Sequence, residues 1–348
     1  MKVKTFFTKI SIILFISLVF LSCSENSNSK KVVVYAHDSF VADWGAGPQL
    51  EELFESKTGL DLVFVSVGDS GQVLSRAILE KDNPNSDVLL GIDNQLLQKA
   101  LDENLLQEYT PKNAKDNISE ELWFEQNLKS NEWFLTPYDW SAFAIMFDTL
   151  ATENGTSLTP PSSLSDLTKK EYKKKLILMD PRTSTPGLGF VAWTVSIFGD
   201  DYLDYWKNLK DSILTMAPGW DTGYGLFTSG EAPLVISYTS SEPYHVECDN
   251  TNRYKALYFE EGHSFQIEGA GITKNAKNID GAKQFLDFLV SEEAQAIIPT
   301  TQWMYPVNKN VVLPESFSQI KMPKLLPSVD SQVLDEAVES ILQTISSN

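Results

Sequence analysis

Short apolar segments alternate with amphipathic helical segments over the first hundred residues, and this alternation strongly limits the possible folds. Residues 31–35, 60–67 and 87–90 are rich in β-branched residues and leucine, as expected of buried strands. Between them apolar residues recur at helical spacing, for example at Leu50 and Phe54. A β-α-β-α-β-α order with short connections predicts a parallel sheet covered by helices on both faces.

The same alternation returns in the second half of the chain. A strand is expected at 176–179, followed by helices at 190–198 and 201–210. Further strands are expected at 212–216 and 234–238, where short apolar runs are bounded by polar residues. This pattern predicts a second α/β unit rather than an extension of the first.

Two extended segments, near 134–142 and 258–270, connect the two halves. With 348 residues, the chain is longer than a single hydrophobic core usually accommodates. No long polar linker and no internal repeat follow position 31. We therefore expect two lobes that are joined by more than one strand and can close over a ligand by a hinge motion. The expected limits are 32–135 plus 262–308 for the first lobe, and 136–261 plus 309–348 for the second.

Residues 180–190 read DPRTSTPGLGF and lie between the strand at 176–179 and the helix expected from Phe190. The hydroxyls of Ser184 and Thr185 stand there beside proline and two glycines. A turn of this kind presents free backbone N–H groups at the start of a helix, where they can hold an anion or another acceptor. Taken alone, the stretch allows two interpretations, a capped turn or part of a ligand site.

The charge balance excludes some classes of function. Lys and Arg number 28 against 47 Asp and Glu, so the net charge is −19. This balance argues against a nucleic-acid-binding protein and against electrostatic attraction to anionic lipid. It is compatible with a cationic ligand, although many proteins are acidic for solubility alone.

The N-terminus has the features of a targeting segment. Three lysines occur within the first nine residues, and a mostly apolar run of 12 residues ends at Leu21. That run is short for a membrane span and typical of a signal peptide. Ser22 and Cys23 then resemble a bacterial lipobox, which predicts a signal peptide at 1–22, lipidation of Cys23 and a tether at 23–31. Ordinary signal cleavage nearby is the alternative.

Few residues offer metal or nucleophilic chemistry. Cys248 is the only other cysteine, so no internal disulfide is expected in the mature protein. The three histidines, His37, His245 and His263, lack the spacing of metal ligands, and we predict no metal site.

Several motifs spread over most of the chain carry a family resemblance. They are DSF-x-ADWG-x-GP (38–48), GIDN-x-LL (91–97), DPRTSTPGLG (180–189), GW-x₃-YGLF (219–227), SYT-x-S (237–241), EGH (261–263) and IPT-x₂-WMYPV (298–307). Together they resemble the periplasmic thiamine-binding proteins of bacterial ABC importers, in the iron/polyamine-type branch of the solute-binding proteins.

This resemblance implies a two-lobed, type 2 periplasmic-binding-protein-like α/β fold with hinge strands and a ligand cleft between the lobes. It implies a non-enzymatic, monomeric receptor that captures thiamine, and its phosphates, and delivers it to an ABC permease and ATPase. No cofactor is expected. The resemblance implies contacts of Asp69 and Ser70 with the aminopyrimidine and of Ser184, Thr185 and Gly187 with the hydroxyethyl or phosphate end. Further implied contacts are Trp220, Tyr238, Thr239, Ser240, Ser241, Tyr244 and Trp303, and His37 stands where the family has a tyrosine.

Three other functions remain open. A receptor of the same fold could bind a polyamine or a pyrimidine precursor, since acids and aromatic rings suit those ligands too. An iron receptor is less favoured because the adjacent tyrosine pair of such receptors is absent around Tyr238. An enzyme of the thiamine-cleaving type would need a cysteine nucleophile, and the first lobe has none after Cys23.

Overall fold

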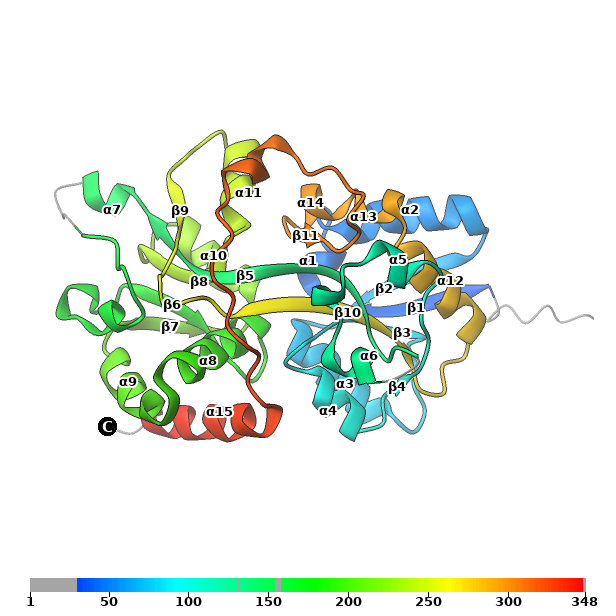
Figure 1. Ribbon diagram of the computed structural model, residues 1–348, viewed down its shortest axis with the longest axis horizontal. Helices are drawn as coiled ribbons and strands as arrows, with labels where there is room; N and C mark the ends of the chain where they lie inside the picture. Colours follow the sequence, from blue (N-terminus) through cyan, green and yellow to red (C-terminus); the bar gives the residue numbers. More distant parts are fainter. Residues whose placement is uncertain (1–29, 130–131, 154–157, 347–348) are drawn as a thin grey trace, which may run out of the picture.

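The computed structural model describes residues 30–129, 132–153 and 158–346 (Figure 1). The predicted signal peptide and Cys23 lie outside the described residues, as does the predicted tether except for its last two positions. Within the described ranges, no helix combines the length and the apolar character needed to cross a membrane.

The first lobe is built on three parallel strands in the order β2-β1-β3. These are β1 (Lys31–Ala36), β2 (Asp61–Ser66) and β3 (Val88–Asp93). Successive side chains of a strand point to opposite faces, and β1 shows this directly. Val32 and Val34 belong to one apolar cluster of the lobe, whereas Tyr35 belongs to another.

Helices cover both faces of this sheet, as the alternation predicts. Leu50 and Phe54 of α2 (Ala46–Thr58) pack with α12 (Ile279–Leu289) on the face of Val32. On the face of Tyr35 lie α3 (Ser70–Glu80) and α4 (Leu97–Asp102). The carboxyl ends of β1 and β2 lead directly to the loops before α1 (Asp38–Val41) and α3, so these loops lie at one edge of the sheet.

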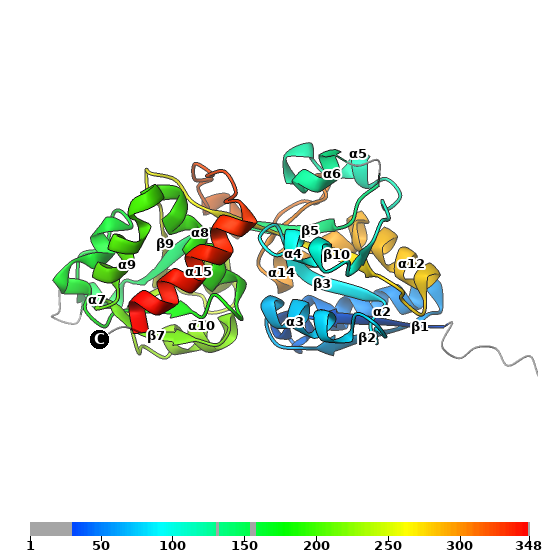
Figure 2. The same ribbon diagram turned by 90° about the horizontal axis from the view of Figure 1, so that it is seen from below.

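The second lobe has its own sheet and core. Its strands are β6 (Leu176–Met179), β7 (Ile213–Ala217), β8 (Leu234–Tyr238) and β9 (Tyr254–Leu257). In this lobe β6 pairs in parallel with both β7 and β8. The helices α8 (Thr185–Phe198), α9 (Tyr202–Leu209), α10 (Trp220–Thr228), α11 (Ser241–Glu247) and α15 (Ser331–Ser346) pack around it. Figure 2 shows α15 lying across the outside of this lobe, where it packs against α8 and α9.

Two long antiparallel strands run between the lobes. The strand β5 (Thr136–Asp148) pairs with β10 (Phe265–Thr273) through its first half and with β8 and β9 through its second half. On the other side, β10 pairs with β3, so one mixed sheet of eleven strands extends through both lobes. Figures 1 and 2 show these strands as the bridge between two separate bodies. The residue limits given above for the lobes stay a prediction.

The remaining elements are short. They are β4 (Leu106–Gln107), α5 (Ala114–Asn117), η2 (Glu120–Leu122), α6 (Glu125–Lys129), α7 (Leu150–Glu153), η3 (Ser165–Thr168), η4 (Lys170–Tyr172), η5 (Gly199–Asp201), α13 (Glu292–Gln295), α14 (Ile298–Thr301), β11 (Tyr305–Pro306) and η6 (Glu315–Gln319). The two 3₁₀ turns η3 and η4 directly precede β6.

The expected start of the helix after β6 was wrong by five residues. Instead of beginning at Phe190, α8 begins at Thr185 with Ser184 as its N-cap, so both glycines lie inside the helix. They permit close packing: a Cβ on Gly189 would lie 2.2 Å from the Phe143 ring. Gly189 therefore lets the helix approach a neighbouring strand closely, and it does not extend the turn before the helix.

Candidate ligand-binding site

A cavity of about 1010 Å³ lies where the two lobes meet. The first lobe contributes the starts of α1 and α3, and the second lobe contributes the starts of α8, α10 and α11. Nine of the thirteen residues predicted to contact ligand line it: His37, Asp69, Ser70, Thr185, Trp220, Tyr238, Ser241, Tyr244 and Trp303. Their individual roles toward a ligand stay predictions.

The other four predicted residues lie behind the wall of the cavity. Ser184 is the N-cap of α8 and is 2% exposed, and a Cβ on Gly187 would lie 2.4 Å from the carbonyl oxygen of Met179. The hydroxyls of Thr239 and Ser240 lie 3.4 Å and 2.8 Å from the Ser141 hydroxyl. These hydrogen bonds fix the end of β8 against β5.

Asp69 connects the two lobes. As the N-cap of α3 it accepts a hydrogen bond from the Ser70 N–H on Oδ1 at 2.7 Å, and its Oδ2 accepts from the Trp220 N–H at 3.2 Å. Burial raises the pKa of Asp69 above its ordinary value, although the nearby Ser184 hydroxyl, His37 and the two backbone N–H groups oppose this shift. The Ser184 hydroxyl does not reach hydrogen-bond geometry with any described group.

Trp220 is the first residue of α10. Its indole Nε1–H donates to the Ser237 hydroxyl at 2.8 Å. The ring stacks on Tyr224 with centroids 4.8 Å apart and an interplanar angle of 17°. Because Tyr224 covers one face of the indole, the opposite face is the one that a ligand in the cavity can use.

A second aromatic wall spans the lobes. Tyr244 on α11 meets Trp303, which lies between α14 and β11, edge to face with centroids 5.7 Å apart. Phe317 stacks on Trp303 at 6.4 Å and 10°. Trp303 has a φ of 54°, a left-handed conformation that is uncommon for a bulky residue and concentrates at functional positions.

His37 is buried at the bottom of the cavity and surrounded by polar groups. Its Nδ1 lies 2.8 Å from the Ser39 hydroxyl, and its Nε2 lies 3.3 Å from the Tyr138 hydroxyl and 3.7 Å from Glu268 Oε2. Burial lowers the pKa of His37, but the charge and hydrogen bond of Glu268 together with the charges of Asp69 and Asp221 outweigh this effect, so the pKa lies above its ordinary value. The surroundings therefore favour the protonated imidazole more than water does.

Buried carboxyl groups of the crossing strands lie behind His37. Glu268 on β10 is the register partner of Asp139 on β5, and it accepts hydrogen bonds from the Tyr138 hydroxyl and the Gln266 amide, each at 3.0 Å. Burial raises the pKa of Asp139 well above its usual range, and the adjacent charge of Glu268 adds to the effect. Burial also raises the pKa of Glu268, but His37 and the hydrogen bonds from Asp139 and Tyr138 together outweigh it and lower that pKa. Of the two carboxyl groups, Asp139 is therefore the one that holds a proton more readily.

Several residues that line the cavity were not predicted from the sequence. These include Ser39, Trp44, Asp221, Tyr224, Gln266, Glu268 and Met304. Ser39, Trp44, Tyr224 and Met304 are named positions of the quoted motifs, which was an available signal, whereas Asp221 falls at a variable position. No local pattern marked Glu268, because its place follows from the pairing of β10 with β5.

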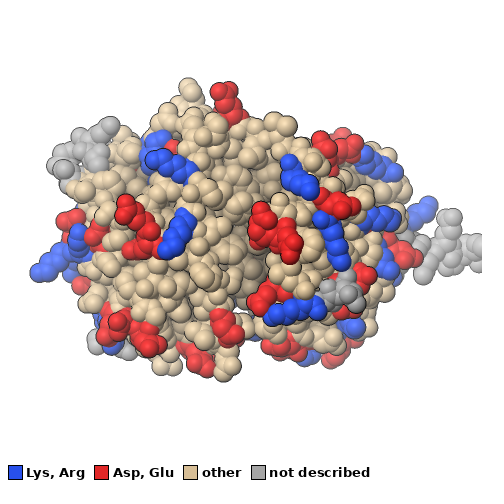
Figure 3. Space-filling view, viewed as in Figure 1, with Lys and Arg blue, Asp and Glu red and all other residues tan. Residues whose placement is uncertain are grey.

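The lining gives the cavity a distinct chemistry. Four carboxylates line it, those of Asp69, Asp221, Asp249 and Glu268, whereas no Lys or Arg of the described residues does. No group of three or more His, Cys, Asp or Glu in the described ranges is arranged to hold a metal ion. Aromatic faces combined with carboxylates suit an organic cation. Elsewhere acidic and basic side chains are interspersed over both lobes on the face shown in Figure 3.

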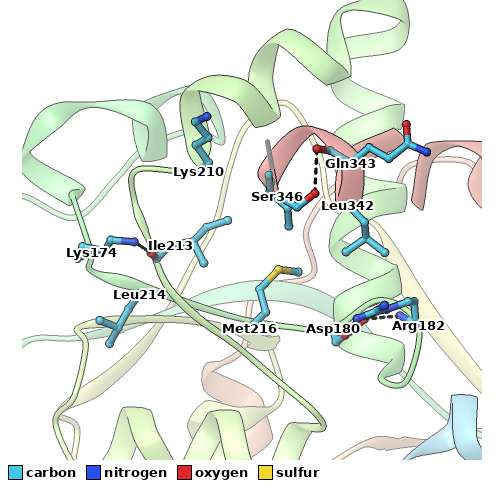
Figure 4. Close-up of a pocket in the computed structure, with 11 residues that line it drawn as sticks. Lys174, Asp180, Arg182, Lys210, Ile213, Leu214, Met216, Leu342, Gln343 and Ser346 are labelled. Carbon is cyan, nitrogen blue, oxygen red and sulfur yellow. Dashed lines mark hydrogen bonds and ion pairs between the residues drawn. The ribbon is translucent and has the colours of Figure 1, made fainter. Parts of the chain in front are cut away.

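A second hollow, of about 610 Å³, lies on the outside of the second lobe beside the last turns of α15 (Figure 4). Its cationic groups are engaged locally. The Arg182 guanidinium pairs with Asp180, and the Lys174 ammonium donates to the Ile213 carbonyl at 2.9 Å. It therefore lacks the convergent free polar groups of the interlobe cavity.

Comparison with known proteins identifies the family to which the chain belongs. Residues 83–325 match the family described as bacterial extracellular solute-binding protein. The chain belongs to this family. The solute-binding protein is 37% identical over 305 residues to the thiamine-binding periplasmic protein of Brucella melitensis biotype 1, covering 84% of each chain. It is 38% identical over 304 residues to the thiamine-binding periplasmic protein of Escherichia coli K12, covering 87% of this chain and 89% of that one.

A solved structure described as a periplasmic thiamin binding protein also matches this solute-binding protein. The two superpose with a TM-score of 0.81 at 34% identity, over 91% of this chain and 96% of the other. The resemblance stated from the motifs and the predicted two-lobed α/β fold are both confirmed.

Proposed function

We propose that this solute-binding protein is a periplasmic receptor that captures thiamine between its lobes and delivers it to an ABC permease and ATPase. The observation that carries the proposal is the interlobe cavity, where free aromatic faces stand beside carboxylates and unpaired hydroxyls. The names of the relatives at 37% and 38% identity point to the same ligand.

The three chemical parts of thiamine each find a counterpart in the lining. The thiazolium is a cation that aromatic faces such as Trp220 and Trp303 attract, by about 0.5–2 kcal/mol each. The exocyclic amine of the pyrimidine can donate to Asp69, which has lone pairs left after its two backbone hydrogen bonds. The hydroxyethyl end, or a phosphate on it, can reach Thr185 at the start of α8.

Isothermal titration of the purified protein with thiamine tests the proposal. We expect saturable heat with one site per chain at about 20 μM protein, a concentration that detects micromolar or tighter binding. Absence of heat would overturn the proposal. Competition by spermidine, by a pyrimidine precursor and by the two thiamine phosphates, read from tryptophan fluorescence, ranks the other ligands; a tighter spermidine complex would favour a polyamine receptor.

The proposal includes the absence of catalysis. Cys248 lines the cavity and is exposed, but burial of its surroundings and nearby acids raise the pKa of its thiol, which disfavours the reactive thiolate. Incubation of thiamine with the protein and an added nucleophile should release no free pyrimidine. Release that is lost in Cys248→Ser would identify an enzyme of the thiamine-cleaving type.

We also propose that the receptor works as a monomer held to the membrane by lipid on Cys23. Metabolic labelling with a radioactive fatty acid tests the anchor, with Cys23→Ala as the control. Equal labelling of both proteins, or of neither, contradicts it. Size-exclusion chromatography with light scattering tests the monomer.

A further inference from the structure

Asp221 is a cavity carboxylate with no fixed partner. It is the second residue of α10, directly after Trp220, and its side chain lines the cavity. Within the described ranges its carboxylate makes no hydrogen bond or ion pair. The residue is exposed and lines the cavity, so the carboxylate is available to whatever binds there.

The groups that face Asp221 come from the other lobe. It interacts electrostatically with His37, Asp69 and Asp38, all at the carboxyl edge of the first-lobe sheet. Asp69 approaches the same helix start, because its Oδ2 accepts from the N–H of Trp220. One carboxylate from each lobe therefore stands at the start of α10, beside Trp220.

A second feature of the cavity also indicates an unsatisfied partner. The hydroxyl of Thr185 is 2% exposed, lines the cavity and has no hydrogen-bond partner among the described residues. A buried hydroxyl without a partner costs free energy unless a ligand supplies the hydrogen bond. The Thr185 hydroxyl at the start of α8 and the Asp221 carboxylate at the start of α10 are thus both available to one bound molecule.

We propose that Asp221 determines specificity for the positive charge of the ligand, by holding a ring cation over the free face of Trp220 opposite Asp69. The inference rests on the proposed thiamine function and deepens it. Asp69 is anchored by two backbone hydrogen bonds, whereas Asp221 is free to approach the charged part of the ligand. An aromatic face and a carboxylate both attract a cation, and neither favours a neutral ring to the same extent.

A purely structural role for Asp221 makes a different prediction. An acidic residue in the first turn of a helix stabilises that helix through its dipole, whatever ligand is bound. Replacing it would then lower the free energy of unfolding and weaken charged and neutral ligands alike. A role in charge selection acts on the charged ligand alone.

The test compares thiamine with its neutral isostere, in which a thiophene ring replaces the thiazolium. Both are titrated into wild type, Asp221→Asn and Asp221→Ser; serine suits a helix start and guards against loss of fold. We expect both variants to bind thiamine about fivefold to tenfold more weakly, because the site is partly solvated, and the isostere within about twofold of wild type. Asp200→Asn, which removes an exposed charge of the same lobe outside the cavity, should change neither affinity.

The outcomes separate the two proposals. If wild type binds thiamine and the Asp221 variants lose equal affinity for both ligands, or lose none, the charge-selection proposal is overturned and the receptor function stands. If wild type binds neither ligand, the receptor function fails and this inference fails with it.

A proton measurement adds an independent readout. Burial and the neighbouring carboxylates raise the pKa of Asp221, while His37 opposes them. A bound cation lowers that pKa, so thiamine binding at mildly acidic pH should release protons. Titrations in two buffers of different ionisation enthalpy should show less release in Asp221→Asn than in wild type. Equal release in both proteins contradicts the proposal.

Discussion

The Asp69 carboxylate accepts the backbone N–H of Trp220 at 3.2 Å, across the boundary between the two lobes. Asp69 caps α3 in the first lobe, and Trp220 begins α10 in the second. A carboxylate at a helix start is stabilised by the free N–H groups and by the helix dipole. The residue that the resemblance assigned to the ligand therefore also joins the two lobes.

Removing the charge of Asp69 should weaken both ligand binding and closure. Hydrogen bonds to a charged group contribute about 1.5–3 kcal/mol, so Asp69→Asn should lower thiamine affinity at least about tenfold. Titration calorimetry measures the affinity, and small-angle scattering of the ligand-bound protein should report a larger radius of gyration. The matched control is Glu52→Gln, an exposed acid of the same lobe, which should leave both quantities unchanged. Wild-type affinity and scattering in Asp69→Asn would contradict the bridging role.

A substitution of Gly71 tests how closely the two lobes approach each other without changing a charged residue. It lies in the first turn of α3, and a Cβ there would meet the Thr183 carbonyl oxygen of the second lobe at 2.9 Å. Gly71→Ala should therefore oppose closure and lower ligand affinity about fivefold or more, while alanine in a helix keeps or raises the free energy of unfolding. Affinity by titration and stability by urea unfolding give the two values. Ser75→Ala, on the exposed side of the same helix, should change the affinity little; an unchanged affinity in Gly71→Ala would show that the lobes meet differently.

Much of the fold followed from local pattern, and what did not follow depended on contacts between distant segments. The strands at 176–179 and 234–238 were predicted with the observed limits, because short apolar runs between turn residues define buried strands. The early start of α8 was missed because Gly189 is explained by the Phe143 ring of a distant strand. Propensity alone treats such a glycine as a turn signal.

The residues of the site also fall into those that the sequence predicted and those that depend on contacts between distant segments. Five of the nine predicted lining residues stand inside the quoted motifs, and the other four came from the wider family resemblance. The buried pair of Asp139 and Glu268 exists only through the register of β5 with β10, which no single segment encodes. The helix α10 was not predicted, because the glycines of GW-x₃-YGLF lower helix propensity, and packing on the sheet overrides that preference.

Substitution of Ser184 distinguishes a ligand-binding role of its hydroxyl from a role in capping α8. Its hydroxyl is buried and has no hydrogen-bond partner among the described groups, so it carries a desolvation cost in the free protein. Ser184→Ala should leave the melting temperature of the free protein equal or higher. If the hydroxyl turns to the ligand on binding, thiamine affinity should fall about fivefold, the equivalent of about 1 kcal/mol.

The control for Ser184 is the neighbouring hydroxyl of Thr183, which already makes a hydrogen bond. Thr183 donates to the Pro218 carbonyl at 2.7 Å, so Thr183→Val should lower the melting temperature by removing a hydrogen bond that is already made. A lower melting temperature in Ser184→Ala, with unchanged affinity, would assign its hydroxyl to the stability of the α8 start alone.

The His37–Glu268 pair predicts a specific dependence of stability on pH. Because Glu268 raises the pKa of His37 above its unfolded value, the folded state binds the proton more tightly. This contribution is fully present below the unfolded pKa, about 6.5, and is lost as pH rises through the folded pKa. The free energy of unfolding, measured by urea titration, should therefore fall as pH rises above about 6.5 in wild type, and this slope should be shallower in His37→Gln.

The other buried histidines act in the opposite direction, and this distinguishes them from His37. Burial lowers the pKa values of His245 and His263, so each favours the unfolded state as pH falls below about 6.5. Above that pH their contributions are constant, and the difference between wild type and His37→Gln isolates one residue. Glu268→Gln removes the charge that raises the pKa of His37 and should abolish the same slope while the imidazole remains. A slope that persists in Glu268→Gln would mean that Asp69 and Asp221, the other carboxylates around His37, sustain its charge.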